Sequence, residues 1–188
     1  MVVTEEGKYD IGMYQESKRK YPKNPNYDFS DARMIIVQES NMEYICSCNR
    51  QSQVSHVEEY LAKGSYIVSC KVNWDSNQTE KPICLTSYGP GKVYFEKINR
   101  DIAPVFKKGM IESYAQKNPG KIKYYEKLNI PTAYNETQFS IETGIGYIKV
   151  KNPSNKWFAT TISMKKMTGM KVIKPSKLPH RFDMNPNV

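Results

Sequence analysis

The chain has 188 residues and a formal net charge of +9, from 28 lysines and arginines against 19 acidic residues. This length suits one domain with extensions, and a hydrophobic content of 39% permits a packed core. No apolar stretch approaches the roughly 20 residues that span a bilayer, and the first residues lack the apolar core of a signal peptide. We therefore expect an intracellular, reduced protein whose positive charge favours anionic partners.

Apolar and polar residues alternate with a period of two along much of the chain, which is typical of half-buried antiparallel strands. The segments with strand patterns are 8–15, 33–38, 43–48, 53–61, 65–72, 82–88, 93–98, 139–151, 156–164 and 170–173. The clearest alternation follows Gly64, which we expect to act as a turn residue with freedom to take positive φ. In this central strand Tyr66, Val68, Cys70 and Val72 share one face.

One helix is predicted, over about 101–117. Asp101 is a good N-cap, and Pro104 is tolerated in the first turn. The helix must end before Pro119. The segment 121–134 is basic and rich in tyrosine, and its pattern predicts no particular element.

Eight or nine short strands with turn residues between them predict an all-β antiparallel sandwich with one inserted helix and extended termini. We place an N-terminal extension at 1–8 and the sandwich at 9–173. Prolines in the last stretch, at 174–188, favour an extended tail without a core of its own.

Several blocks of the chain, in order, resemble the β-sandwich domain III of calpain-type cysteine proteases, in the stand-alone form common in ciliated protists. In that domain a strand ends in a Gln…Arg pattern, as at Gln15 and Arg19, and a Leu-x-x-Gly-x-Tyr turn opens a central strand, as from Leu61 to Tyr66. The other similar blocks are 26–37, 144–148, 152–155 and 157–164. The resemblance covers roughly 9–173 and implies an eight-stranded, C2-like sandwich.

The protease core of that family has no counterpart in this chain. Nothing matches the motifs of its catalytic Cys, His and Asn, and the chain is too short to hold that core beside a sandwich. The resemblance therefore implies the regulatory and binding module alone, and we expect no enzymatic activity. The histidines His56 and His180 are interpreted as structural or surface residues. An enzymatic interpretation would need a metal or a bound substrate analogue beside His56.

We expect no cofactor and no metal. Structural zinc usually takes a cysteine pair on a tight knuckle, whereas the cysteines here fall on separate strands and are better explained as buried small apolar residues. They are Cys46, Cys48, Cys70 and Cys84. Calcium needs several acidic groups in one place, and the acids of the loops are too dispersed for it. These are Asp28, Asp31, Asp75 and Glu80.

The positive charge is dispersed along the chain and not gathered into one arm. We expect a non-enzymatic structural or adaptor subunit of a larger assembly that binds an acidic protein surface. Given the form of the family, the expected location is cytoplasmic, in a ciliary or flagellar axoneme, with tubulin or other axonemal proteins as partners. The candidate partner-binding residues are Lys18, Arg19, Lys20, Lys23, Lys121, Lys123, Lys127, Lys174, Lys177 and Arg181.

The alternative is a C2-like module that binds acidic phospholipid or regulates a calpain-type protease. The same basic loops would serve it, because acidic lipid head groups and acidic protein surfaces both attract them by charge. Nucleic acid is not expected, since no known motif for reading it appears.

Overall fold

The computed structural model describes residues 1–20, 28–74, 81–125, 133–153, 158–162 and 180–184, the last two ranges by their main chain alone. The chain divides into two compact units. The first comprises 1–119 and 138–147, and the second comprises 120–137 and 148–188. These boundaries differ from the single module at 9–173 that the sequence predicted.

The first unit contains a five-stranded sheet in which every pair of neighbours is antiparallel, with the order β4-β3-β6-β1-β8. Its strands are β1 (Val2–Val3), β3 (Asp31–Gln38), β4 (Tyr44–Gln51), β6 (Gly64–Asn73) and β8 (Val93–Tyr94). The predicted central strand, β6, lies in the middle of this sheet. The expected strand at 93–98 is shorter than predicted, because its neighbour β1 offers only two residues for pairing.

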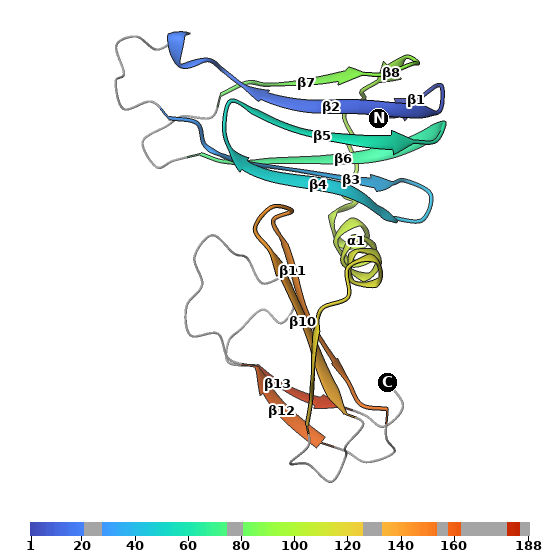
Figure 1. The fold of residues 1–188 in the computed structure, drawn as a ribbon, viewed down its shortest axis with the longest axis vertical. Coiled ribbons are helices and arrows are strands. Elements are labelled where there is room, and N and C mark those ends of the chain that lie inside the picture. The colour runs from blue at the N-terminus through green and yellow to red at the C-terminus, as the bar shows by residue number, and fades with distance from the viewer. Residues whose placement is uncertain (21–27, 75–80, 126–132, 154–157, 163–179, 185–188) are drawn as a thin grey trace. The chain divides into compact units, whose positions relative to one another are not determined.

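A second, three-stranded antiparallel sheet lies face to face with the first, in the order β5-β2-β7 (Figure 1). Its strands are β2 (Gly7–Gln15), β5 (Val54–Leu61) and β7 (Ile83–Tyr88). A short 3₁₀ helix, η1 (Lys18–Lys20), follows β2. The predicted all-β sandwich with one helix is confirmed. The eight strands of its two sheets, β1 to β8, all lie in the first half of the chain. The prediction had included strands as far as residue 173.

The core between the sheets follows from the alternation along each strand. Met34 and Ile36 of β3 point into it with Ile11 of β2, and each is at most 1% exposed. The intervening Ile35 and Val37 are also buried, on the opposite face of β3. An uninterrupted apolar run therefore belongs here to a strand that is covered on both faces.

The helix α1 (Ala103–Lys117) covers that second face of the five-stranded sheet (Figure 1). Its buried residues Phe106, Met110 and Tyr114 recur every four positions and form one stripe. Asp101 is not the N-cap that the sequence predicted. The cap position is Ile102, and the Asp101 carboxylate accepts the Ala103 N–H from just outside the helix, at 3.0 Å.

The predicted N-terminal extension contains a strand, which corrects the expectation of an extended N terminus. Val2–Val3 form β1, which pairs with both β6 and β8, and Val3 is 1% exposed. A two-residue strand is too short to show an alternating pattern, so no strand was predicted at these residues.

Three further strands form a sheet with the order β11-β10-β9. They are β9 (Lys121–Tyr124), β10 (Tyr134–Ser140) and β11 (Ile145–Lys151). The single strand predicted at 139–151 is a hairpin, because Gly144 takes a φ of 66°, a left-handed conformation that favours glycine. The tip of this hairpin belongs to the first unit.

The last described strands, β12 (Phe158–Ile162) and β13 (His180–Met184), form an antiparallel pair. β12 lies within the strand predicted at 156–164. β13 lies in the segment expected to be an extended tail, which corrects that expectation for these five residues. The strand predicted at 170–173 lies outside the described residues.

Candidate binding surfaces

The first group of predicted basic residues lies in η1, where all three side chains are exposed. Two of them already have acidic neighbours. Lys18 Nζ lies 2.9 Å from Asp28 Oδ1, and Lys20 Nζ lies 2.7 Å from Glu16 Oε1. The hydrogen bond from Lys18 lowers the pKa of Asp28, whose carboxylate is thus held in its charged form. The charge of this group is therefore largely balanced by its own surroundings.

A second pair of predicted residues, Lys121 and Lys123, lies on β9. The register of β9 with β10 sets them beside Thr137 and Asn135, so both lysines project from the same face of the sheet. Both are exposed, and within the described part of the chain neither amine makes an ion pair. This pair is the better candidate for attracting an anionic partner.

The opposite face of β9 carries two large side chains, Ile122 and Tyr124, which are 51% and 52% exposed. The Tyr124 ring meets the ring of Tyr134 edge-on at 5.9 Å between centroids. Ile122 lies opposite Glu136, which accepts the Gly120 N–H at 2.9 Å and is itself buried. The strand thus exposes cations on one side and apolar groups on the other.

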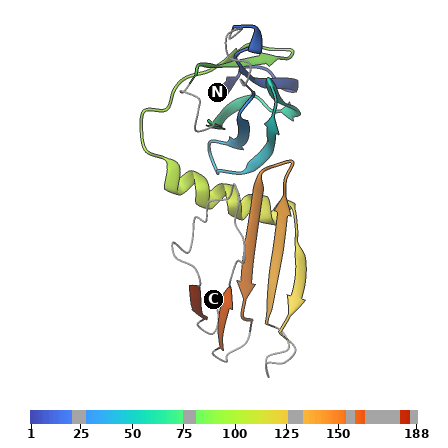
Figure 2. The same ribbon diagram turned by 90° about the vertical axis from the view of Figure 1, so that its left-hand side faces the viewer.

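One main-chain edge of β9 faces away from β10, because β9 is the outermost strand of its sheet (Figure 2). The Tyr125 N–H donates to the Ala133 carbonyl at 2.9 Å, which fixes the direction of the neighbouring groups. In an extended strand these groups alternate, so those of Lys121 and Lys123 point toward β10. Those of Ile122 and Tyr124 point outward, and no described strand pairs with them.

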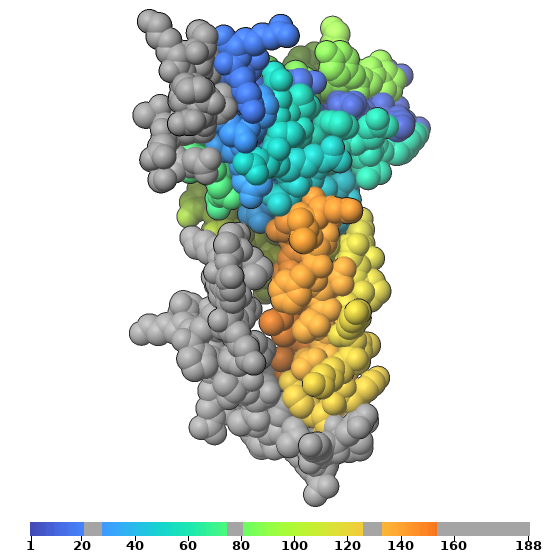
Figure 3. Space-filling view, turned by 60° about the vertical axis from the view of Figure 1, so that its left-hand side comes forward, coloured from blue at the N-terminus to red at the C-terminus, as the bar shows by residue number. Residues whose placement is uncertain are grey.

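The space-filling view shows β9, in yellow, along one margin of the orange surface of β10 and β11 (Figure 3). β9 was not predicted from the sequence. The alternation of Lys, Ile, Lys and Tyr in β9 covers only four residues, and its partner strand β10 begins only at Tyr134. This short alternation was the one feature of the sequence from which β9 could have been predicted.

Lys23, Lys127, Lys174 and Lys177 lie outside the described residues. Arg181 lies in β13, where it pairs with Thr161, and only its main chain is described.

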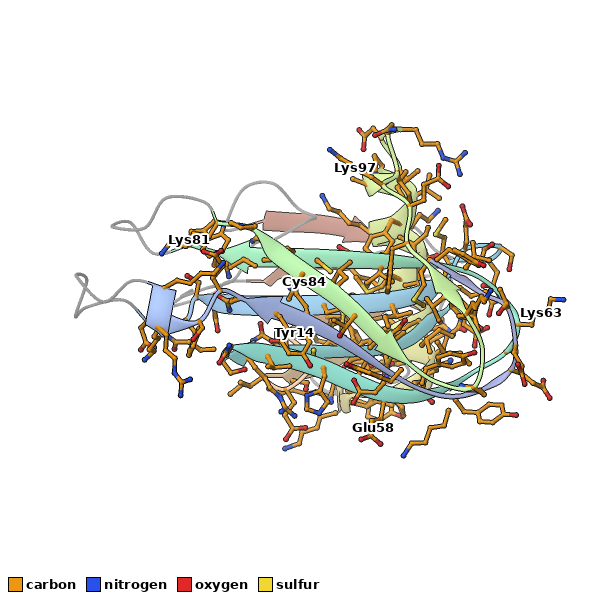
Figure 4. All side chains as sticks on the ribbon, turned by 90° about the horizontal axis from the view of Figure 1, so that it is seen from above. Tyr14, Glu58, Lys63, Lys81, Cys84 and Lys97 are labelled. Atoms are coloured by element: carbon orange, nitrogen blue, oxygen red, sulfur yellow. The ribbon has the colours of Figure 1, made fainter. Side chains whose placement is uncertain are left out.

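Three cysteines of the sandwich lie in its core, and the fourth lies with His56 on an outer face. Cys46, Cys48 and Cys70 line the core, and burial raises the pKa of Cys46 to about 12 and that of Cys70 to about 11. Cys84 is exposed, contrary to the expectation that all four are buried, and lies beside Tyr14 on the outer face of the three-stranded sheet (Figure 4). His56 lies on that same outer face, opposite Gly12.

No group of three or more His, Cys, Asp or Glu side chains among the described residues could hold a metal ion. Of the acids weighed for calcium, Asp28 is paired with Lys18 and Asp31 opens β3, while Asp75 and Glu80 lie outside the described residues. No helix in the described ranges is both long and apolar enough to cross a membrane.

Comparisons of the chain with protein-family models, with curated proteins and with solved structures find no match.

Proposed function

We propose that this protein is a non-enzymatic binding module that serves as a structural or adaptor subunit and holds an acidic protein surface. The observation that carries the proposal is β9, whose four side chains are all exposed and whose two lysines have no ion-pair partner in the described chain. Exposed like charges on one sheet face attract an anionic partner and repel other basic proteins.

The assembly that best suits this module is a ciliary or flagellar axoneme. This step rests on the resemblance of the sequence to the stand-alone calpain-type domain III and on the net charge of +9. The microtubule lattice would then be the acidic counter-surface. Binding through exposed lysines should weaken as salt rises, because exposed charges are screened over about 10 Å at 0.1 M ionic strength.

Co-sedimentation with microtubules at physiological salt tests the proposal. The wild-type chain should enter the pellet, and the double variant Lys121→Glu, Lys123→Glu should lose most of that binding. The matched control is Lys63→Glu, Lys71→Glu, which reverses two exposed lysines of the first unit and changes the net charge equally. Equal losses in both variants would mean that net charge alone drives binding. No wild-type binding would contradict a microtubule partner.

Liposome flotation separates the alternative function. Flotation that needs anionic lipid and fades with salt, in a protein that ignores microtubules, would favour a membrane-targeting module over the proposed one.

A further inference from the structure

We propose that β9 binds its partner by strand addition, and that the partner contributes an extended segment in which acidic and apolar residues alternate. This inference rests on the proposed function, because it specifies how the same lysines meet an acidic protein. It adds a main-chain component that charge attraction alone does not require.

The main-chain component comes from the outer edge of β9. The N–H and C=O groups of Ile122 and Tyr124 point away from β10, so the edge offers two donors and two acceptors at the spacing of a strand. Peptides commonly bind exposed sheet edges by completing this ladder of hydrogen bonds.

The side chains on either side of the edge define the sequence of the added strand. Residues opposite Lys121 and Lys123 share the lysine face, so aspartate or glutamate there would form cross-strand ion pairs. Residues opposite Ile122 and Tyr124 lie on the other face, beside two half-exposed apolar side chains. An acidic residue at every second position, with apolar residues between, satisfies both faces.

The same arrangement excludes a second copy of β9 as the occupant. If two β9 edges pair antiparallel through their outward groups, a lysine of one lies opposite a lysine of the other in both registers that engage Ile122. Lysines on edge strands discourage self-association in this way. Charge complementarity therefore selects an acidic segment.

The test measures binding of a short fluorescent peptide of alternating aspartate and valine to the full-length protein by anisotropy. In antiparallel addition, valines would lie opposite Ile122 and Tyr124, so their N–H groups point toward β9. N-methylation of the valines should weaken binding about fivefold or more, while N-methylation of the aspartates, whose N–H groups point away, should change it little. Equal effects of the two methylated peptides would overturn strand addition.

Two variants probe the protein side. Lys121→Glu with Lys123→Glu should weaken binding about tenfold. Ile122→Pro removes one outward N–H and no bond to β10, and should weaken binding about fivefold. Hydrogen exchange on the wild-type protein tests the same main-chain contacts without relying on the folding of the Ile122→Pro variant. The bound peptide should slow exchange of the Ile122 and Tyr124 amides and leave those of Lys121 and Lys123 unchanged.

The outcomes separate the two proposals. Microtubule binding that depends on the lysines, together with peptide binding insensitive to Ile122→Pro and to N-methylation, would leave the proposed function standing and overturn strand addition. A peptide that fails to bind a protein that binds microtubules would also overturn it. If the wild-type protein bound neither microtubules nor the peptide, both proposals would be overturned.

Discussion

At the scale of single residues, Gln15 shows how one buried polar side chain can join separate segments. Its amide nitrogen donates to the carbonyls of Ser30, at 2.7 Å, and Ser52, at 3.1 Å. Its amide oxygen accepts the Ser30 N–H at 3.0 Å, and the side chain is almost fully buried. The end of β2 is thereby tied to the start of β3 and to the turn between β4 and β5.

Replacing Gln15 with Met should lower the free energy of unfolding by about 2–3 kcal/mol. Met keeps the length of the side chain but removes the three hydrogen bonds that Gln15 makes with Ser30 and Ser52. In urea unfolding the midpoint should fall while the m-value stays the same.

The control for this change is Gln53→Ala. Gln53 is exposed and contributes its main-chain carbonyl, which accepts the Gln15 N–H at 2.8 Å. Its truncation should cost less than about 0.5 kcal/mol. If Gln15→Met unfolded at the same urea concentration as this control, the three hydrogen bonds would contribute nothing measurable.

At the scale of elements, β1 has only two residues and fills the place between β6 and β8. Besides the pairing of Val2 and Val3, the Tyr66 N–H donates to the Met1 carbonyl at 2.8 Å, and the Thr4 N–H donates to the Lys92 carbonyl at 3.1 Å. Without these residues the five-stranded sheet would be divided, and a core position would be empty.

Val3→Ala should destabilise the protein by about 2 kcal/mol, because Val3 is 1% exposed and the substitution removes buried methyl groups. Val2→Ala is the matched control, since Val2 lies on the other face of the same strand and is 44% exposed. It should cost less than about 0.5 kcal/mol. Thermal unfolding of the two variants, side by side, gives the comparison. Equal shifts would mean that β1 frays and does not belong to the core.

Strands with at least six residues were largely predictable, because alternation needs several repeats to be visible. The core strands from β2 to β7 fall where the pattern placed them, and β3 was identified by its continuous apolar run. β1 and β9 have two and four residues, too few for the alternation to be visible, and neither was predicted. The hairpin at Gly144 was predicted as one strand, since alternation continues across a turn that a glycine's positive φ permits.

The candidate site was predictable only in part. The positive charge of Lys121 and Lys123 makes them candidates in the sequence alone. Their shared face and the free edge of β9 depend on pairing with β10, from which they are separated by intervening residues. In η1 the prediction also included lysines whose charge is paired with an acidic side chain in the folded protein. The Lys20–Glu16 pair has the i, i+4 spacing visible in the sequence, whereas Lys18–Asp28 depends on how β3 approaches.

At the scale of the whole molecule, the first unit is discontinuous, because the hairpin tip returns to it after the chain has left at residue 119. Ile145 and Tyr147 are 6% and 7% exposed and pack with Tyr114 of α1. Main-chain groups of the tip are also bound: Arg33 donates to the Gly144 carbonyl at 2.9 Å, and the Asn49 N–H donates to the Glu142 carbonyl at 2.8 Å.

Truncation of the chain measures what this return contributes. A fragment of residues 1–119 lacks the tip, whereas 1–153 keeps it, and Trp74 is the single tryptophan in both, so its fluorescence follows the same unit. Burial of two large side chains contributes about 1.5–3 kcal/mol each, so 1–119 should be less stable than 1–153 by about 4 kcal/mol in urea unfolding. Ile145→Ala in the full chain should lower the free energy of unfolding by about half of that difference. This variant checks the contribution of the tip without shortening the chain. Coincident unfolding curves for the two fragments would contradict the discontinuous unit, because the apolar face of β3 and α1 would then be closed without the tip.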